Sequence, residues 1–370
     1  MDVRIVGGGF AGIVTGLALL SRDPEGEHRV TVYERGPEVG TTLCGEGLSK
    51  TTLDRMRFEG FDHTPYIGHG FSSAAWYVPD GKSVAVPDPC FTMDRARWIP
   101  AMAEHLERLG GTVETDRKLS VGDIRNLPGD LVVGADGPGS QTRKIVGGNV
   151  RTRLGIQYRV QDSDHESDEL FFLVDKRFSP EYSWIFPRGA VDGFGKMDNV
   201  GILAAEDGDD WARLDRFMAH WGVTGKKAKK EAYPIAFGGD KVQEGRYALV
   251  GDAAGLTNPV TKGGMAAVVY AAELLADSVK EGSPERYGKR VMSHPIADPV
   301  FLRALKVITE TPNGEVVRWM RHLPERFVVG ERSSKVSWGL VLRTMLAAPR
   351  RIPDWFAVYR AMAMSRVYSW

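Results

Sequence analysis

The chain has 370 residues, of which 42% are hydrophobic and 26% charged, the composition of an ordinary folded protein. Its 48 Lys and Arg residues balance 48 Asp and Glu residues, which argues against a dedicated nucleic-acid-binding protein. The length favours two interleaved structural units. Only two cysteines are present, which suits a reducing cytoplasm and offers neither a disulfide framework nor a metal site with zinc-ligand spacing.

The first elements predict a βαβ unit with a glycine-rich turn. Residues 3–6 read as a strand, the sequence Gly-Gly-Gly-Phe-Ala-Gly follows, and an apolar helix runs to about residue 20. Gly7 permits the tight turn, Gly9 lets the main chain approach a pyrophosphate, and Gly12 allows close packing of helix on strand. Together with Ala11, these residues are candidate contacts to a dinucleotide at the helix N-terminus.

An acidic residue closes the second predicted strand, at residues 29–33. Glu34 lies 22 residues beyond Gly12. A carboxylate at this position can accept hydrogen bonds from both ribose hydroxyls and disfavours a 2′-phosphate. The turn and the acid therefore predict FAD or NAD rather than NADP.

Further along the chain, segments typical of a parallel α/β unit alternate with segments typical of an antiparallel sheet. Residues 93–109 predict an amphipathic helix, 112–119 and 131–133 predict strands, and 154–205 predict several short antiparallel strands. Residues 247–250 return to a buried parallel strand, 265–279 predict a helix, and everything after about residue 284 reads as helical with interrupting prolines.

These patterns predict an α/β fold in which a Rossmann-type FAD-binding domain is interleaved with an antiparallel β-sheet substrate domain, with helices at the C-terminus. We expect the cofactor domain to comprise residues 1–75, 92–150 and 236–284. The substrate domain would then comprise 76–91 and 151–235, and the helical region 285–370. No run of about 18 apolar residues predicts a membrane-spanning helix.

Two later segments favour FAD over NAD. Residues 130–137 read Asp-Leu-Val-Val-Gly-Ala-Asp-Gly, and a strand ending in Gly251-Asp252 precedes Lys262-Gly263-Gly264-Met265. An aspartate at the carboxyl end of a strand can accept hydrogen bonds from ribityl hydroxyls. The main-chain N–H groups of Gly264 and Met265 would face the N1/O2 edge of the flavin and favour its anionic reduced form.

With these motifs in place, residues 2–280 resemble the superfamily of p-hydroxybenzoate-hydroxylase-like flavoproteins. The resemblance implies that Arg95, which opens the helix after the first crossover, contacts FAD. It also implies that the main chain of Leu119 passes the adenine side.

Two segments resemble the geranylgeranyl reductase family, whose members saturate isoprenoid double bonds. The first is Cys44-Gly45-Glu46-Gly47-Leu48-Ser49, and the second, more specific, is the Tyr-x-Trp-x-Phe-Pro string at residues 182–187. The family pattern continues with Gly-x-Gly, whereas this chain has Gly-Ile-Leu at 201–203 after a longer insertion. The resemblance implies digeranylgeranylglycerophospholipid-reductase-like activity on isoprenoid lipids, with the departure leaving the substrate class open.

Tyr182, Trp184 and Phe186 alternate along the strand and therefore project onto one face. By spacing alone these aromatic side chains favour an ordinary sheet core. The resemblance favours a second interpretation, in which they line an apolar tunnel for a polyprenyl chain.

Cys44 also has two interpretations. An isolated cysteine such as Cys90 is most often a small buried hydrophobe. The resemblance places Cys44, Gly45 and Gly47 over the flavin, where the glycines let the main chain touch the cofactor. The thiol is then a candidate for shaping the site or for assisting protonation of the alkene while hydride arrives from the reduced flavin.

The C-terminal tail suggests a partner. Residues 335–370 carry six Lys or Arg and one Asp, interleaved with Trp338, Trp355, Phe356, Tyr359, Tyr368 and Trp370. A basic aromatic segment can lie on an anionic lipid surface, although packed helices with solvated arginines give the same pattern. We expect a cytoplasmic protein with peripheral membrane contact, an isoprenoid lipid substrate, and ferredoxin or NAD(P)H as electron donor.

Three other functions share parts of this pattern. A flavin monooxygenase or halogenase would use the same FAD motifs with O₂ and an aromatic substrate. A dehydrogenase passing electrons to quinone generally carries additional cysteine modules, which two cysteines cannot supply. A prenyl-binding escort protein uses a related fold without catalysis and needs no intact flavin site.

Overall fold

The computed structural model describes residues 1–370 with short gaps. The residues outside the description are 24, 41–42, 87, 166, 192–194, 322–325, 329–341, 343–345, 347–348 and 369–370. Lys335, Trp338 and Trp370, which the tail hypothesis includes, therefore lie outside the described residues.

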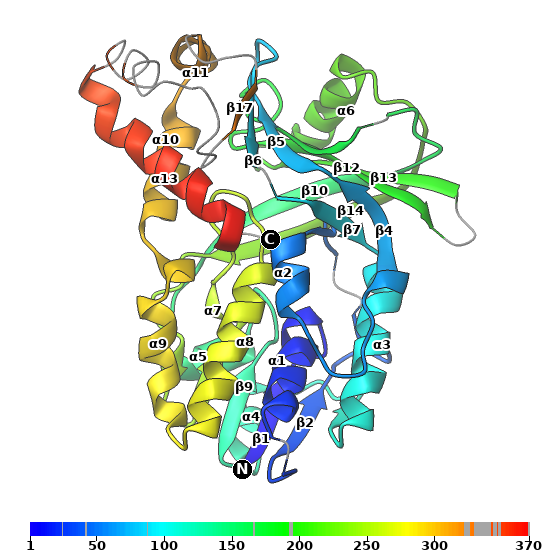
Figure 1. The fold of residues 1–370 in the computed structure, drawn as a ribbon, viewed down its shortest axis with the longest axis vertical. Coiled ribbons are helices and arrows are strands. Elements are labelled where there is room, and N and C mark those ends of the chain that lie inside the picture. The colour runs from blue at the N-terminus through cyan, green and yellow to red at the C-terminus, as the bar shows by residue number, and fades with distance from the viewer. Residues whose placement is uncertain are drawn as a thin grey trace.

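A six-stranded sheet forms the half of the molecule that contains the N-terminus (Figure 1). Its strands are β1 (Asp2–Val6), β2 (Arg29–Tyr33), β8 (Thr112–Glu114), β9 (Leu131–Gly134), β15 (Gln243–Glu244) and β16 (Tyr247–Leu249). The order is β15-β16-β9-β1-β2-β8, and all neighbours are parallel except β15 and β16. The first strand lies in the centre, so the chain reverses direction of winding beside β1, where Rossmann-type sheets bind ligands.

Helices cover this parallel sheet, as the βαβ connections require. They are α1 (Phe10–Ser21), α3 (Arg95–Arg108), α4 (Val121–Asn126), α5 (Gln141–Val146), α7 (Gly251–Ala254) and α8 (Met265–Lys280). The apolar helix α1 packs between α8 and α3 over β1 and β2. This buried core holds the glycine turn and the start of α8 in fixed positions.

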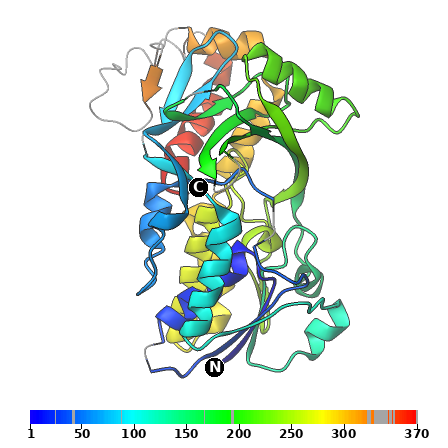
Figure 2. The same cartoon turned by 90° about the vertical axis from the view of Figure 1, so that its right-hand side faces the viewer.

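An eight-stranded, strongly curved sheet forms the other half (Figure 2). Its strands are β5 (Ser73–Tyr77), β6 (Ser83–Val86), β10 (Arg151–Gln161), β11 (Glu169–Leu173), β12 (Ser183–Val191), β13 (Gly195–Leu203), β14 (Lys226–Phe237) and β17 (Arg326–Val328). The order is β14-β10-β13-β12-β11-β5-β6-β17, and most neighbours are antiparallel. The predicted α/β fold with an antiparallel second sheet is confirmed.

A small sheet connects the two halves. It consists of β3 (Gly47–Ser49), β7 (Cys90–Met93) and β4 (Ile67–Phe71), with β7 in the centre. The short helix α2 (Lys50–Arg55) begins directly after β3, where the Ser49 side chain accepts a hydrogen bond from the Thr52 N–H. The helix start at Ser49 thus ends β3, the strand into which the Cys44–Gly47 segment leads.

Each face of the large sheet packs against different helices. One face meets α6 (Asp210–His220) through Leu214 and Phe217. The other meets the C-terminal helices, through Phe301 of α10, Met320 of α11 and Met362 of α13. These helices are α10 (Val300–Glu310), α11 (Asn313–Met320) and α13 (Ile352–Tyr368), whereas α9 (Tyr287–Ser293) packs on the six-stranded half through Tyr287 and Val291. Successive side chains of β12 point to opposite faces of the sheet and therefore belong to two separate apolar clusters.

Two sequence expectations are wrong in detail. The region after residue 284 is not all helical, because β17 pairs in parallel with β6 at the edge of the large sheet. A three-residue strand is too short to show alternation, so tertiary pairing alone creates it. The strand expected over 112–119 ends at Glu114, after which the chain turns through Asp116 at φ 56.

The domain boundaries of the sequence analysis stay a proposal. The large sheet takes its strands from residues 73–86, 151–237 and 326–328, and the six-stranded sheet from 2–134 and 243–249. The chain therefore passes between the halves several times, which is compatible with the interleaved division but does not fix its limits.

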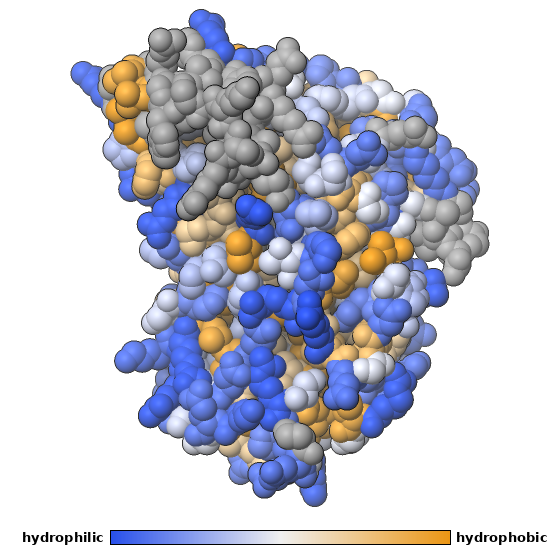
Figure 3. Space-filling model, viewed as in Figure 1, coloured by the Kyte–Doolittle hydropathy of each residue, from blue (hydrophilic) through white to orange (hydrophobic). Residues whose placement is uncertain are grey.

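The surface seen in Figure 3 is mostly hydrophilic over the half that contains the N-terminus. Apolar side chains gather at the corner where α13 begins, and Phe356 on that helix is 58% exposed. None of the described helices is long and apolar enough to cross a membrane.

Candidate functional site

A cavity of about 990 Å³, including its open mouth, lies between the two halves of the molecule. From the six-stranded half it is lined by the glycine turn, the start of α3, and the segment from β16 to α8. From the large sheet it is lined by residues of β10, β12 and β14. The predicted site residues at its wall are Gly9, Ala11, Cys44, Gly45, Arg95, Trp184, Asp252, Gly264 and Met265.

The glycine turn has the geometry that its sequence requires. Gly7 has a φ of +112, and a Cβ on it would overlap the carbonyl group of Ala135. A Cβ on Gly12 would overlap the carbonyl oxygen of Gly7. Helix α1 starts immediately after Gly9 with no side-chain cap, so its first N–H groups are available to a ligand in the cavity.

Glu34 lies beside this turn rather than in the cavity wall. Its Oε2 accepts a hydrogen bond from the Gly8 N–H at 2.7 Å, and its Oε1 accepts one from the Gly36 N–H at 2.9 Å. Leu119 also lies outside the cavity wall, although the nearby Arg117 N–H donates to the Glu34 carbonyl oxygen at 2.8 Å. The carboxylate is thus held next to the turn with lone pairs left to accept further bonds.

Asp252 and the start of α8 face the cavity together. Asp252 Oδ1 accepts a hydrogen bond from Thr257 Oγ1 at 2.7 Å. Burial raises the pKa of Asp252, while the Thr257 hydroxyl and the nearby Arg95 act in the opposite direction. Gly264 precedes α8 without a side-chain cap, so the positive end of this 16-residue helix opens on the cavity.

Arg95 provides the test of whether an anionic dinucleotide fits. Its side chain is buried, and its Nε has no hydrogen-bond partner. Among the described residues no carboxylate pairs with it, and its nearest aromatic contact is the ring of Phe10 at 5.9 Å. A buried cation that borders a cavity without a carboxylate partner fits a phosphate-bearing ligand, so the residues present fit FAD.

Cys44 and Gly45 form one wall of the cavity. The Gly45 position leaves little room for a larger residue, because a Cβ there would lie 3.0 Å from Phe186 Cε2 of β12 and the ring would have to shift. Cys44 is partly exposed, whereas Cys90 in β7 is completely buried, and burial raises the pKa of the Cys90 thiol. The two cysteines therefore differ in their surroundings: Cys44 borders the cavity and Cys90 packs in the core.

The three aromatic residues of the Tyr-x-Trp-x-Phe string lie in the same apolar cluster, as their alternation predicts. Only Trp184 borders the cavity. Its indole Nε1 is buried without a hydrogen-bond partner, and a Cβ on Gly201 would overlap its ring. Tyr182 is buried and donates to the Thr261 carbonyl oxygen at 2.5 Å, and Phe186 packs against the Cys44 segment.

The glycine at 201 therefore has a packing role. It is the single glycine kept where the related pattern has Gly-x-Gly, and it provides the space into which the Trp184 ring fits. The insertion before it forms the hairpin between β12 and β13, part of which, residues 192–194, lies outside the described residues.

Lys262 is a cavity residue to which the sequence assigned no role. Its side chain is 2% exposed, and its Nζ donates to Glu181 Oε2 at 2.5 Å and to the Pro259 carbonyl oxygen. Burial lowers the pKa of Lys262 to about 8, although Glu181 opposes the shift. A lysine after Asn-Pro gives no sequence signal for burial, because lysine is normally exposed.

The part of the wall that β10 and β14 contribute was not predicted from the sequence. Gln157 of β10 and Glu231 and Tyr233 of β14 line the cavity. Burial raises the pKa of Tyr233, and the neighbouring Asp252 acts in the same direction. The available signal was the alternation of Gln157, Arg159 and Gln161 with Ile156, Tyr158 and Val160 along β10.

Comparison with known proteins agrees with this geometry. The model of the NAD(P)-binding Rossmann-like domain family matches residues 5–76. The chain is 19% identical to a geranylgeranyl bacteriochlorophyll reductase-like protein from Thermoplasma acidophilum, with a TM-score of 0.76, covering 96% of this chain and 98% of that one. It is 18% identical to CmlS, a flavin-dependent halogenase, with a TM-score of 0.63, covering 98% and 72%.

The fold and the site define an FAD-dependent oxidoreductase, so FAD is confirmed as the predicted cofactor. The relatives are more specific. The chain is 28% identical to digeranylgeranylglycerophospholipid reductase 2 of Methanopyrus kandleri, over 92% of this chain and 96% of that protein. It is 26% identical to digeranylgeranylglycerophospholipid reductase of Methanothrix thermoacetophila, over 82% and 88%. The resemblance that the two motifs predict is therefore confirmed: the chain is a homologue of these reductases.

Proposed function

We propose that this protein saturates C=C bonds of geranylgeranyl or other isoprenoid chains, with membrane ether lipids of the archaeal type as the substrate class. One observation carries the proposal: the cavity that fits FAD is closed on its other side by Trp184, the Cys44 segment and the large sheet. A reacting alkene in this space would lie between cofactor and aromatic wall. The names of the relatives support the same substrate class.

The proposed cofactor contacts follow from position. The turn of Gly7, Gly9, Ala11 and Gly12 would approach the pyrophosphate, and Glu34 would accept from the ribose hydroxyls. A second set would hold the remainder of FAD: Arg95, Leu119, Asp252, Gly264, Met265, Cys44, Gly45 and Gly47. In this assignment Leu119 contributes only main chain on the adenine side.

Reduced FAD, when bound, supplies the hydride for the alkene. The protein must supply the rest. Trp184 and the apolar wall exclude water, which an isolated alkene requires because it is a poor hydride acceptor. A proton must reach the second carbon from a group within about 3 Å, and the Cys44 thiol is our candidate to hold it or to shape its path. Tyr182 and Phe186 support Trp184 from within the same cluster.

The electron donor is external in this proposal, and NAD(P)H and reduced ferredoxin are the two candidates. Anaerobic mixing of the FAD-loaded protein with each donor would separate them by the rate at which the visible absorbance of the oxidised flavin disappears. A donor that leaves the absorbance unchanged while the other removes it is excluded.

Peripheral membrane contact is the second part of the partner hypothesis. Several tail aromatics are packed inside: Trp355 contacts Trp319, with 4.7 Å between ring centroids, and Tyr368 contacts Tyr270, with 5.2 Å. Among the described residues of the tail, Leu342, Leu346 and Phe356 are 55%, 58% and 58% exposed and are the large apolar side chains available to a lipid surface. Flotation with anionic vesicles should recover less Phe356→Ser protein than wild type, and equal recovery would reject this contact.

The decisive experiment is mass spectrometry of lipids from a host that makes geranylgeranylated lipids, with and without the protein. We expect a gain of two hydrogen atoms for every double bond reduced. Unchanged lipids from cells that contain the FAD-loaded protein and an active donor system would reject the reductase function.

The role of the thiol is tested separately with Cys44→Ser, using Cys90→Ser as the control. We expect Cys44→Ser to retain FAD but to lose reductase activity, and Cys90→Ser to retain both. Full activity of Cys44→Ser with normal FAD content would show that the thiol has no chemical role.

A further inference from the structure

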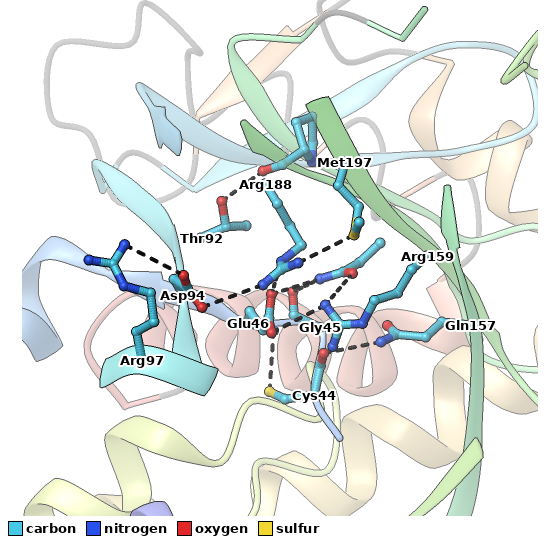
Figure 4. A network of polar contacts seen from close by, with 12 residues as sticks. Cys44, Gly45, Glu46, Thr92, Asp94, Arg97, Gln157, Arg159, Arg188 and Met197 are labelled. Carbon is cyan, nitrogen blue, oxygen red and sulfur yellow. Dashed lines mark hydrogen bonds and ion pairs between the residues drawn. The ribbon is translucent and has the colours of Figure 1, made fainter. Parts of the chain in front are cut away.

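A buried charge cluster surrounds Glu46, the one charged residue of the Cys44–Gly47 segment. Glu46 is 4% exposed, and its carboxylate pairs with the Arg188 Nε and with Arg159 Nη1 at 3.3 Å. Asn199 Nδ2 donates to the same carboxylate at 3.3 Å. Figure 4 shows Glu46 between the two arginine side chains, with Cys44 directly below it. The partners come from β10, β12 and β13, so the cluster joins this segment to the large sheet.

A second buried carboxylate pairs with Arg159. Glu231, which is 3% exposed, accepts from Arg159 Nε at 3.0 Å and from Gln157 Nε2 at 2.7 Å. Burial opposes the charged form of Arg159, yet the flanking Glu46 and Glu231 carboxylates raise its pKa. The ion pairs therefore persist at every pH at which the carboxylates are ionised, and neither buried arginine is left without a carboxylate.

The cluster also holds the main chain of the cavity wall. Gln157 Nε2 donates to the Cys44 carbonyl oxygen at 3.1 Å, and Asn199 Nδ2 donates to the Gly45 carbonyl oxygen at 2.9 Å. The Glu46 N–H points back to Cys44 Sγ at 3.2 Å. Each of the two cavity-lining residues is thus bonded to a side chain that itself belongs to the Glu46 cluster.

The backbone at Glu46 is in a conformation that needs such support. Its φ is +72, in the left-handed region that side chains other than glycine rarely adopt. This conformation costs on the order of 1 kcal/mol and persists only where the surroundings impose it. Glycine stands on both sides, at 45 and 47, yet the strained position carries a carboxylate, so the side chain itself supplies the constraint.

We propose that Glu46 is the positioning residue of the cavity wall formed by Cys44 and Gly45, acting through Arg159, Arg188 and Asn199. Its side chain does not line the cavity, and it acts by fixing where the Cys44 thiol and the Gly45 main chain face the cavity. The inference rests on the proposed function only for the identity of the molecules that this wall meets. A consequence is that the FAD side and the large-sheet side of the site move as one unit.

The chain contains its own reporter for this proposal, because Cys44 borders the cavity and Cys90 is fully buried. Release of the wall exposes Cys44 alone, whereas general unfolding exposes both. We would therefore alkylate Glu46→Gln and wild type with iodoacetamide and follow each cysteine by peptide mass spectrometry. Rates are compared at the alkaline limit of the rate profile, where the thiol is fully ionised in both proteins, because removing a nearby charge also alters ionisation.

Loss of about 1.4 kcal/mol of restraint should raise the Cys44 alkylation rate of Glu46→Gln about tenfold. The Cys90 rate should stay at the wild-type value. An unchanged Cys44 rate would overturn the proposal, and so would a parallel rise at both cysteines, which would mean that Glu46 serves overall stability only. Glu181→Gln is the matched control: it removes another buried, ion-paired carboxylate beside the same cavity and should leave Cys44 at the wild-type rate.

A variant that lacks both charges of the closest pair guards against failure of Glu46→Gln to fold. In Glu46→Gln/Arg188→Met the net charge of the cluster is preserved, and we expect the same selective rise at Cys44. Adding FAD separates this proposal from the proposed function. If the cavity does not bind FAD, wild-type Cys44 will not be protected by the cofactor, but the difference between wild type and Glu46→Gln will remain.

Discussion

Two buried ion-pair clusters border the cavity, and they are built differently. The Glu46 cluster uses two arginines, whose guanidinium groups each reach more than one partner. The second cluster uses one lysine, Lys262, paired with Glu181, which is shared with Arg153 at 2.7 Å. Both are almost fully shielded from water, so burial acts against the charged form in both.

The pKa values of the buried cations nevertheless shift in opposite directions in the two clusters. The pKa of Arg159 is raised, because two carboxylates outweigh burial, whereas the pKa of Lys262 falls to about 8, because one shared carboxylate does not. Because Arg159 pairs with the carboxylates of both Glu46 and Glu231, these ion pairs keep the Glu46 cluster together. In the second cluster Lys262 has a single carboxylate partner, and the lysine loses its charge within an accessible pH range.

The largest expected effect is the loss of stability when Lys262 loses its carboxylate partner. Glu181→Leu leaves the buried Lys262 ammonium without its carboxylate and should lower the free energy of unfolding by about 3–5 kcal/mol at pH 7. Urea unfolding measures the change. The double variant Glu181→Leu/Lys262→Met should recover most of the loss, and failure to do so would mean that packing rather than charge sets the cost.

Removing one carboxylate from the Glu46 cluster should lower the free energy of unfolding by less. Glu46→Gln keeps the shape of the side chain, and Arg159 keeps Glu231 as a partner, so we expect a loss of about 1.5–3 kcal/mol in the same urea experiment. A loss larger than that of Glu181→Leu would contradict the view that several partners together stabilise the buried arginines.

Arg95 sharpens the comparison, because it is a buried cation beside the cavity with no carboxylate partner among the described residues. Arg95→Met should weaken FAD binding about tenfold, or 1.4 kcal/mol, since a charge-assisted contact to the cofactor is lost. The free energy of unfolding of the FAD-free protein should not fall. Fluorescence titration with FAD and urea unfolding give the two values, and a destabilised FAD-free protein with normal FAD affinity would place Arg95 among the structural ion pairs.

The smallest effect is a pH dependence specific to Lys262. Its folded-state pKa lies below the unfolded value, so between about pH 8 and 10 the unfolded chain binds more protons and the free energy of unfolding rises with pH. Relative to Lys262→Met, wild type should gain about 1 kcal/mol from pH 8 to pH 9. The difference between the two proteins cancels Lys176, whose pKa is also lowered to about 8 by burial. A pH-independent difference would show that Lys262 stays charged.

Local motifs were predicted well because their geometry is local. The turn at Gly7–Gly12, the acid at Glu34 and the strand ending before Asp252 are each recognisable in a short window of sequence. The proposed Tyr-x-Trp-x-Phe face was likewise predictable, since alternation along a strand places the rings on one side. The cofactor class and the fold followed from these segments.

The amino-acid sequence alone determined the cofactor-binding half and the presence of a second, antiparallel sheet. Both follow from backbone preferences and hydrophobic periodicity, which depend on short segments of the sequence. The tertiary structure alone decided which charges meet. Glu46 and Arg159 are 113 residues apart, and Lys262 and Glu181 are 81 residues apart. No local pattern distinguishes a buried arginine or lysine from a solvated one, since its charge becomes tolerable only when the fold brings a carboxylate to it.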